Sequence, residues 1–418
     1  MLFFGFLVFI FLIIIRPQDF WAPVMGTRIV FYLMGVLLVV WIFSTIPKNL
    51  FQTALDKFVS LFFLAVMIST LSVNWISYSV EITIETFKQA LIYFFAVTII
   101  DDDQKFKSAS WTLILLMTVL AGISILQYYG INITGAEMLW SDVKNVWQIK
   151  MVGIFDNPND VAYSVVLVVP FALGLFFHSK TYRARIGAII LFGISGYCIY
   201  ISKSRGGYLA VMFCVLTWLF LWINNKTFKK AALVIGFIGL LGAFYIQSKD
   251  YREEGSAMGR VDAWVAGMNM LESSPIIGVG KGQFREHHKK DSHSSYVRAG
   301  AELGLMGLYA FVGIIYSAFI FLIPAGVACP DKKWKIYQFG YISYLASYTV
   351  ASIFSTRTYD IVFLVVIALI ANLKRVAISK IKDYEDLEDV NEGLMNKHVV
   401  GLTILTLVMW KIFLIQTW

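Results

Sequence analysis

The stretch GVGKGQFREHHKKDSHSSYVRAGAELGLMG, residues 278–307, decides how the rest of this chain is understood. Residues 281–293 of this stretch hold three of the five histidines of the protein among several Lys, Arg and Glu residues. Its second half turns into an apolar helix punctuated by glycine, and apolar segments flank it on both sides. Ionisable groups beside a bilayer are costly, so a dense group of them indicates a functional site.

The composition predicts a membrane protein. Of the 418 residues, 58% are hydrophobic and only 15% are charged, far from the balance of a soluble domain. Apolar runs of the length that spans a bilayer recur along the whole chain. We therefore predict an all-α polytopic protein, a single integral domain over residues 1–418 with about 12–13 transmembrane helices. The expected spans are 2–15, 29–46, 58–73, 83–100, 111–129, 161–177, 186–202, 207–223, 231–247, 296–323, 336–354, 359–373 and 399–416.

The first run, residues 2–15, lacks a basic leader and a cleavage site, so we expect it to be a retained span. The positive-inside rule then places the N-terminus in the cytoplasm. The loops assigned to the inside carry Lys48, Lys57, Lys105, Lys107, Lys180, Arg183, Arg185, Lys226, Lys229, Lys230, Lys332, Lys333, Lys335, Lys374, Arg375, Lys380 and Lys382. The outer loops 130–160 and 248–295 are long, the second with a helical pattern at 259–271, and residues 374–398 form a cytosolic linker.

Several classes of function are disfavoured. The net charge of +8 is scattered among loops, so we expect no nucleic-acid partner. Residues 278–282 have glycines without the Walker A spacing, and no loop is large enough for a nucleotide-binding domain. The spacing of His287, His288 and His293 with Glu286 and Asp291 matches no standard zinc pattern, and adjacent basic residues repel a cation. We predict neither a metal nor another cofactor. The three cysteines predict no disulfide framework.

His293 is the first candidate catalytic residue. Ser294 or Ser295 is suited to cap a helix that begins near Tyr296. The imidazole then lies beside the positive end of a helix dipole, which disfavours the imidazolium form. A neutral histidine at the membrane surface is able to accept a proton from a hydroxyl group. The alternative is that His293 is a solvated loop residue or only part of a cap.

Glu302 is too far from His293 to orient it, because nine residues of straight helix span ~13 Å. We expect Glu302 to pair with a basic group on another span or to close a polar cluster. Gly300 and Gly304 form a GxxxG pattern, with Gly307 one turn later, which predicts tight packing under the loop.

Two arginines are candidates for binding an anion. Arg205 lies in the short turn Ser204-Arg205-Gly206-Gly207, and Arg260 opens the helical part of the long outer loop. A guanidinium keeps its charge and matches phosphate oxygens with paired donors, so two of them near a histidine suit a diphosphate. The alternative for each is a snorkelling or loop arginine.

Four pieces of sequence resemble one family. His293-Ser294, followed after nine residues by Gly304-Leu305-Met306-Gly307, resembles the signature of bacterial O-antigen ligases and O-antigen polymerases. The segments 153–159 (GIFDNPN), 204–207 (SRGG) and 278–284 (GVGKGQF) agree with it in order, over about 150–320. Ser294 replaces the commoner Asn.

The resemblance implies a GT-C-like glycosyltransferase of the bacterial cytoplasmic (inner) membrane that needs no metal or nucleotide sugar. Its donor is a glycan on undecaprenyl diphosphate, and its acceptor is a hydroxyl group of lipid A core, a growing glycan or a protein. Arg205 and Arg260 are expected to stabilise the departing diphosphate, and His293 to deprotonate the acceptor. We expect further substrate-binding residues at Ser294, Asn157, Asn159, Lys281, Arg285, Tyr296 and Arg298.

The sequence does not separate a ligase from a polymerase or a protein O-oligosaccharide ligase, because all three share the donor chemistry. A secondary transporter is the alternative from another class. The repeated halves typical of transporters are not seen, and the charges gather at the outer face.

Overall fold

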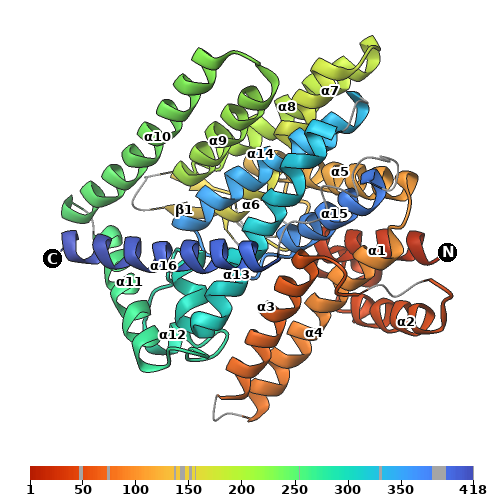
Figure 1. Cartoon of the computed structure of the whole chain (residues 1–418). Coiled ribbons are helices and arrows are strands. Elements are labelled where there is room, and N and C mark those ends of the chain that lie inside the picture. Colours follow the sequence, from red (N-terminus) through yellow and green to blue (C-terminus); the bar gives the residue numbers. More distant parts are fainter. Residues whose placement is uncertain are drawn as a thin grey trace.

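The computed structural model describes residues 1–46, 50–72, 76–135, 138–141, 146–149, 153–155, 157–253, 255–328, 332–378 and 392–417. Helices dominate (Figure 1). The first half contains α1 (Leu2–Ile15), α2 (Ile29–Phe43), α3 (Ala54–Leu71), α4 (Ile76–Ile99), α5 (Asp103–Tyr128), α6 (Pro158–Val165), α7 (Val168–His178) and α8 (Tyr182–Ile201), with short 3-10 turns at Pro17–Asp19 and Ala22–Val24. The second half contains α9 (Arg205–Trp222), α10 (Lys226–Glu253), α11 (Gly255–Ser273), α12 (Phe284–His287), α13 (Ser295–Ala328), α14 (Lys332–Phe354), α15 (Ile361–Ile378) and α16 (Glu392–Thr417).

The prediction of an all-α polytopic membrane protein is confirmed. Within the described part of the chain, eight helical segments are long and apolar enough to cross a membrane. Three shorter apolar helices, Leu2–Ile15, Ile29–Phe43 and Ile361–Leu373, coincide with further predicted spans. The remaining two predicted spans, 231–247 and 336–354, fall inside α10 and α14. Every predicted span is therefore helical, although fewer than thirteen meet the length and hydropathy of a complete crossing.

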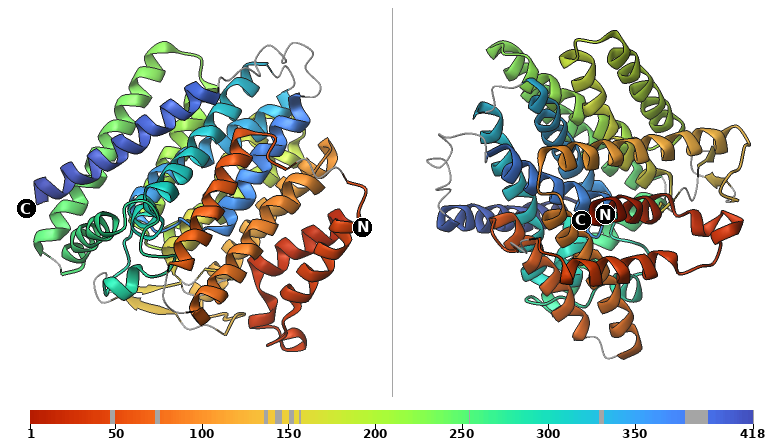
Figure 2. Two further views of the ribbon diagram at one scale, coloured as in Figure 1. Left: turned by 60° about the horizontal axis from the view of Figure 1, so that its bottom comes forward. Right: turned by 90° about the vertical axis from the view of Figure 1, so that its right-hand side faces the viewer.

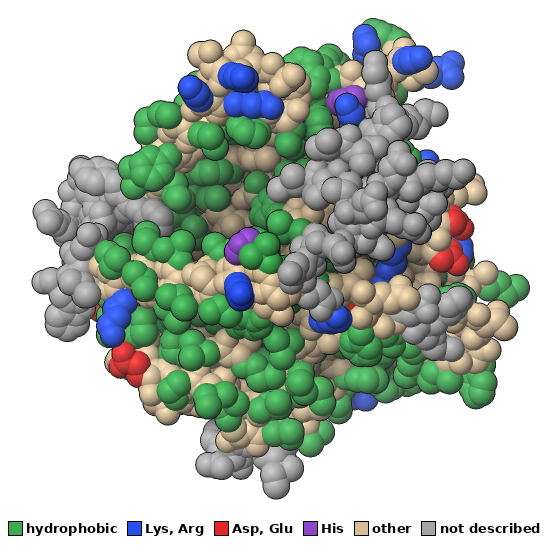
Figure 3. Space-filling model, viewed as in Figure 1, with side chains coloured by type: hydrophobic (Ala, Val, Ile, Leu, Met, Phe, Trp, Pro, Cys, Tyr) green, Lys and Arg blue, Asp and Glu red, His purple; other side chains and the backbone are tan. Residues whose placement is uncertain are grey.

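The helices form one bundle whose two ends differ (Figure 2). A two-stranded antiparallel hairpin of β1 (Leu139–Ser141) and β2 (Val146–Gln148) lies at the same end as α12. The face in Figure 3 is largely apolar and is hollowed between α10 and α16, while basic side chains gather at its upper rim, where α7 meets α8 and α9 meets α10. An apolar belt with charge at the rim suits a protein embedded in lipid.

Side-chain caps define where several helices begin. Thr53 and Asp56 form a capping box at α3, and Asp102 caps α5. Ser204 caps α9 by accepting a hydrogen bond from the Gly207 backbone at 3.0 Å. α13 then packs along α3, and α14 along α9 and α7.

The predicted span 296–323 is confirmed as the candidate membrane span Ser295–Leu322, but its helix is interrupted. Gly304 has φ 65° and ψ −163°, which breaks α13 there. A Cβ at Gly304 would lie 2.4 Å from the carbonyl of Ile276, so only glycine fits this backbone. The close approach that the glycine pattern predicted is therefore real, but the partner of Gly304 is loop backbone. Gly300 alone faces another helix, at the Trp410 ring of α16.

The loop 275–280 restores the hydrogen bonds that the break removes. Backbone N–H groups of Val279 and Gly280 donate to Ala301 and Glu302 carbonyls at 3.0 and 2.9 Å. In return, the Leu305 N–H donates to the Pro275 carbonyl at 2.7 Å, and the Met306 N–H to Ile276 at 3.3 Å. A broken helix is tolerated in a membrane protein when other groups satisfy its backbone, and here the loop does so.

Two predicted segments are only partly covered. Most of the linker 374–398, residues 379–391, lies outside the described residues, as do parts of the loop 130–160. The helical pattern predicted at 259–271 is confirmed by α11. Cys198 and Cys214 are buried free thiols, and Cys329 lies outside the described residues.

Candidate functional site

The turn that presents His293 is held by neighbours on both sides. Ser294 is the N-cap of α13, and its Oγ accepts a hydrogen bond from the Val297 N–H at 3.5 Å, as predicted. The carbonyl of Ser292 accepts a hydrogen bond from the Trp264 indole of α11 at 2.8 Å. His293 itself adopts the left-handed conformation, with φ 48°. Non-glycine residues rarely adopt this conformation unless the surroundings impose it.

The pKa of the His293 imidazole is lowered to about 4. Burial by the surrounding protein disfavours the charged form, the Arg260 guanidinium repels it, and Asp291 acts in the opposite direction. The side chain keeps an exposed edge, where water screens part of these effects. The predicted neutral imidazole is therefore confirmed in direction. The causes seen here are burial and Arg260, whereas the sequence indicated the helix dipole.

Arg260 reaches His293 because of the register of α11. Arg260 and Trp264 are four residues apart and share one face of that helix, about 6 Å apart along its axis. The Trp264 hydrogen bond to the residue before His293 fixes this face against the turn. The Arg260 guanidinium consequently acts electrostatically on His293.

Tyr163 is related to both candidate arginines. Tyr163 of α6 is buried, and it is within electrostatic reach of Arg260. The Tyr163 hydroxyl packs against the turn that carries Arg205, so that a Cβ at Gly206 would lie 1.7 Å from it. The Arg205 side chain is exposed at the start of α9. The structure thus brings His293 and Arg260 together, and the backbone turn that carries Arg205 contacts Tyr163, which lies within electrostatic reach of Arg260.

The other predicted site residues are distributed differently. Asn157 caps α6, where its side chain accepts hydrogen bonds from the Asn159 and Asp160 N–H groups at 3.0 Å, and Asn159 is exposed. The Tyr296 hydroxyl donates to the Thr349 carbonyl at 3.3 Å. Arg285 is exposed and lies 3.5 Å from Asp291.

Two of the predicted substrate-binding cations have protein partners; Arg298 is half-buried and Lys281 is buried. Arg298 pairs with Asp291 at 3.1 Å and with Glu302 at 2.9 Å. Of the two expectations for Glu302, a basic partner on another span is wrong, because Arg298 is one turn away on the same helix. The other, that Glu302 closes a polar cluster, is confirmed by its hydrogen bond from the Tyr359 hydroxyl. The Lys281 ammonium lies 3.4 Å from Thr86 Oγ1 and Gln89 Oε1 of α4, and burial lowers its pKa to about 8. A substrate role for these residues stays a prediction.

Residues 188–312 match the family model described as O-antigen ligase. The chain carries an O-antigen ligase domain. The resemblance predicted to the O-antigen ligase and polymerase family is thereby confirmed, and no curated protein matches the chain.

The O-antigen ligase domain contains the predicted triad and the broken part of α13. Arg205, Arg260, His293 and Gly304 all lie between residues 188 and 312, whereas Tyr163 lies before this segment. The helices outside it therefore supply part of the surroundings of the triad.

The sequence did not indicate the contacts of three residues near His293, Arg260 and the Arg205 turn. Asp291 was considered only as a metal ligand, and Tyr163 was not considered at all. Arg357 is buried and ion-paired with Asp360, and its Nη2 donates to Ser164 Oγ at 2.8 Å. The position of Arg357 between two predicted spans was the available signal, because a cation there needs a partner.

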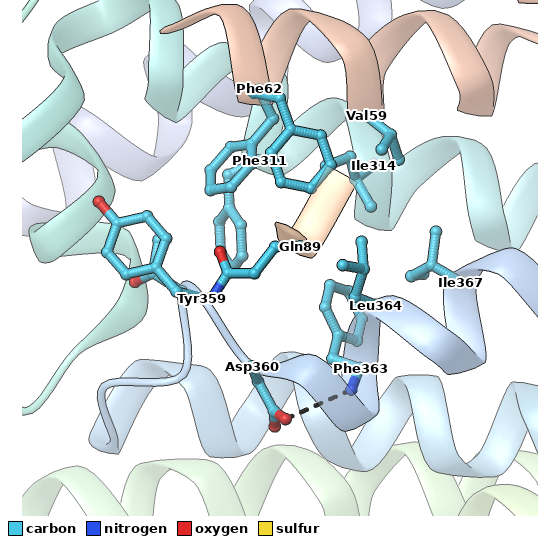
Figure 4. Close-up of a pocket in the computed structure, with 12 residues that line it drawn as sticks. Val59, Phe62, Gln89, Phe311, Ile314, Tyr359, Asp360, Phe363, Leu364 and Ile367 are labelled. Carbon is cyan, nitrogen blue, oxygen red and sulfur yellow. Dashed lines mark hydrogen bonds between the residues drawn. The ribbon is translucent and has the colours of Figure 1, made fainter. Parts of the chain in front are cut away.

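A small pocket lies beside Tyr359, whose hydroxyl contacts the Arg298–Glu302 pair (Figure 4). Apolar side chains of α3, α13 and α15 form its wall, and Gln89, Tyr359 and Asp360 supply its polar groups. The Tyr359 hydroxyl donates to Glu302 at 2.8 Å, which links the pocket to the Arg298 pair. With a volume of about 30 Å³, the pocket has room for water only.

Proposed function

We propose that this protein transfers a glycan from a polyprenyl diphosphate, such as undecaprenyl diphosphate, to a hydroxyl acceptor, as an O-antigen ligase or polysaccharide polymerase. The observation that carries the proposal is the neutral, strained His293 beside Arg260 inside the O-antigen ligase domain. The proposal includes the topology expected from the loops, with a cytosolic N-terminus and the site at the outer face of the bacterial cytoplasmic membrane.

His293 acts as the general base. The side chain is exposed, and among the described residues no hydrogen bond engages its ring, so we propose that the imidazole is free to approach an acceptor hydroxyl. The acceptor oxygen attacks the anomeric carbon of the donor while His293 takes the hydroxyl proton. The bond between that carbon and the phosphate oxygen breaks, and the diphosphate leaves with the electron pair.

Arg260 and Arg205 act on the leaving group. Negative charge develops on the departing diphosphate, where fixed guanidinium donors stabilise the transition state. Bound diphosphate also neutralises Arg260, which relieves the repulsion that Arg260 exerts on a protonated His293. Donor binding therefore makes the imidazole a better base. The diphosphate linkage supplies the driving force, in agreement with a chain in which we found no nucleotide-binding motif.

The test is transfer by purified variants that insert and accumulate normally. His293→Ala and Arg260→Ala are expected to abolish transfer of a lipid-linked glycan. The matched controls are His287→Ala, an exposed histidine of the same loop, and Arg183→Ala, an exposed arginine at the start of α8. Full turnover by the His293→Ala enzyme would exclude the base role.

The acceptor is tested in a deletion strain. Loss of long chains with a single capped unit indicates a polymerase, whereas accumulation of lipid-linked polymer indicates a ligase. Movement of a labelled solute into vesicles without any glycan transfer would instead support a transporter.

A further inference from the structure

The strain at His293 requires a structure that holds it. A left-handed conformation costs a non-glycine residue about 1–2 kcal/mol. Beyond the Trp264 bond and the Ser294 cap, Ser292 Oγ donates to the Ser294 carbonyl at 3.0 Å and closes the turn beneath the imidazole. The conformation of His293 is therefore imposed by the residues on either side of it.

Asp291 is the centre of this arrangement. Its Oδ1 accepts hydrogen bonds from the Ser292 N–H at 2.7 Å, from Thr356 Oγ1 at 3.0 Å and from Arg298 Nη1 at 3.1 Å. Burial opposes ionisation of this carboxyl, but Arg298 and the Thr356 hydrogen bond outweigh it, so the pKa of Asp291 lies below its ordinary value. Asp291 is therefore an anion throughout the neutral range.

Arg298, which pairs with Asp291, is itself fixed by a buried carboxylate. Arg298 Nε donates to Glu302 Oε1 at 2.9 Å, and the Glu302 side chain has no exposed surface. The Tyr359 hydroxyl donates to the other oxygen of Glu302 at 2.8 Å. Arg298 thus bridges two carboxylates, and the bridge ties the loop before α13 to the first turn of that helix.

The charges that face His293 are unequal. Arg260 acts from α11, while Arg285, Lys290 and Asp291 act from its own loop. Of these four groups only Asp291 is an anion. Without it, three cations would oppose a proton on the imidazole.

We propose that Asp291 is a positioning residue for glycan transfer, which fixes the strained turn that presents His293 and supplies the negative charge that lets the imidazole accept a proton beside Arg260. The inference rests on the proposed function, in which His293 takes this proton from the acceptor hydroxyl. It adds to that function a carboxylate that acts through the histidine and need not touch either substrate.

The experiment separates this inference from the proposed function by using two readouts. The first is an NMR titration of ¹³C-labelled histidine in the purified protein without donor, with the His293 signal assigned from His293→Gln. Asp291→Asn is expected to lower the pH at which His293 titrates, whereas Asp291→Glu, which keeps the charge, is expected to leave it near that of the wild type. An unchanged titration in Asp291→Asn overturns the electrostatic role whether or not the protein transfers glycans.

The second readout is the transfer rate at saturating donor. Asp291→Asn is expected to lower kcat ~10-fold with little change in KM, since a weakened base affects the chemical step. Where the Asn variant fails to fold, Thr356→Val serves instead, because it removes one hydrogen bond to Asp291 and is expected to lower kcat severalfold at wild-type accumulation. Wild-type kcat in the folded variants overturns the positioning role. An inactive wild-type protein with the expected titration shift refutes the proposed function alone.

Discussion

Replacing Gly304 by alanine tests the pairing between the broken helix and the loop. The new Cβ would lie 2.4 Å from the Ile276 carbonyl, and the residue would need a φ of 65°. The conformation alone costs about 1–2 kcal/mol. The clash pushes the loop 275–280 away from α13 and weakens or breaks the four backbone hydrogen bonds between them. Each of these bonds contributes a net stability of about 0.5–1.5 kcal/mol. We therefore expect a loss of about 3–8 kcal/mol of stability.

The assay is thermal unfolding of purified protein in detergent, together with glycan transfer. Gly304→Ala is expected to lower Tm by on the order of 5 °C or more and to abolish transfer, because the loop that carries His293 loses its anchor. Gly300→Ala is the matched control: its Cβ would lie 3.2 Å from the Trp410 ring within regular helix, and we expect a change within ~1 kcal/mol. A Gly304→Ala protein with wild-type Tm and activity would refute the reasoning.

Three further predictions concern charge. Because the folded protein lowers the pKa of His293 from 6.5 to about 4, the unfolded chain binds more protons in that range. The stability that the neutral His293 contributes is therefore complete above pH 6.5 and is lost as the pH falls towards 4. For the same reason kcat/KM should fall on the acid side only near pH 4, and a fall near pH 6.5 would contradict the lowered pKa. Arg298→Gln leaves Glu302 buried without its cation and should lower the free energy of unfolding, measured by chemical denaturation, by ~3–5 kcal/mol. The control Arg285→Gln, at an exposed arginine, should change it by no more than ~0.5 kcal/mol. Equal effects of the two substitutions would refute the role of the Arg298 bridge. Arg205→Lys should lose most activity in the assay of glycan transfer by purified protein, since a point charge does not replace a paired donor. Wild-type rates in this variant would argue against diphosphate binding at the turn.

Much of the site was predictable because its chemistry is local. The cap at Ser294 depends on which side chains precede an apolar run. The direction of the shift in the His293 pKa was also predicted, although its causes, burial and Arg260, come from the tertiary structure. The partners of Arg298 and Lys281 were not predictable, because a cation beside carboxylates in a loop has the same sequence pattern whether it faces a substrate or the protein interior. Only burial distinguishes the two, and burial depends on α4 and on the loop before α15.

The sequence by itself determined the helical membrane architecture, the positions of the spans and the family, because hydropathy, caps and short motifs are properties of neighbouring residues. The tertiary structure alone decided that α13 breaks at Gly304 and that Trp264 brings Arg260 to His293. It also decided that Tyr163 contacts the Arg205 turn within electrostatic reach of Arg260. Each of these depends on contact between segments far apart in the chain. Such contacts are set by how the side chains and backbones of whole helices fit together, and no local pattern encodes that fit.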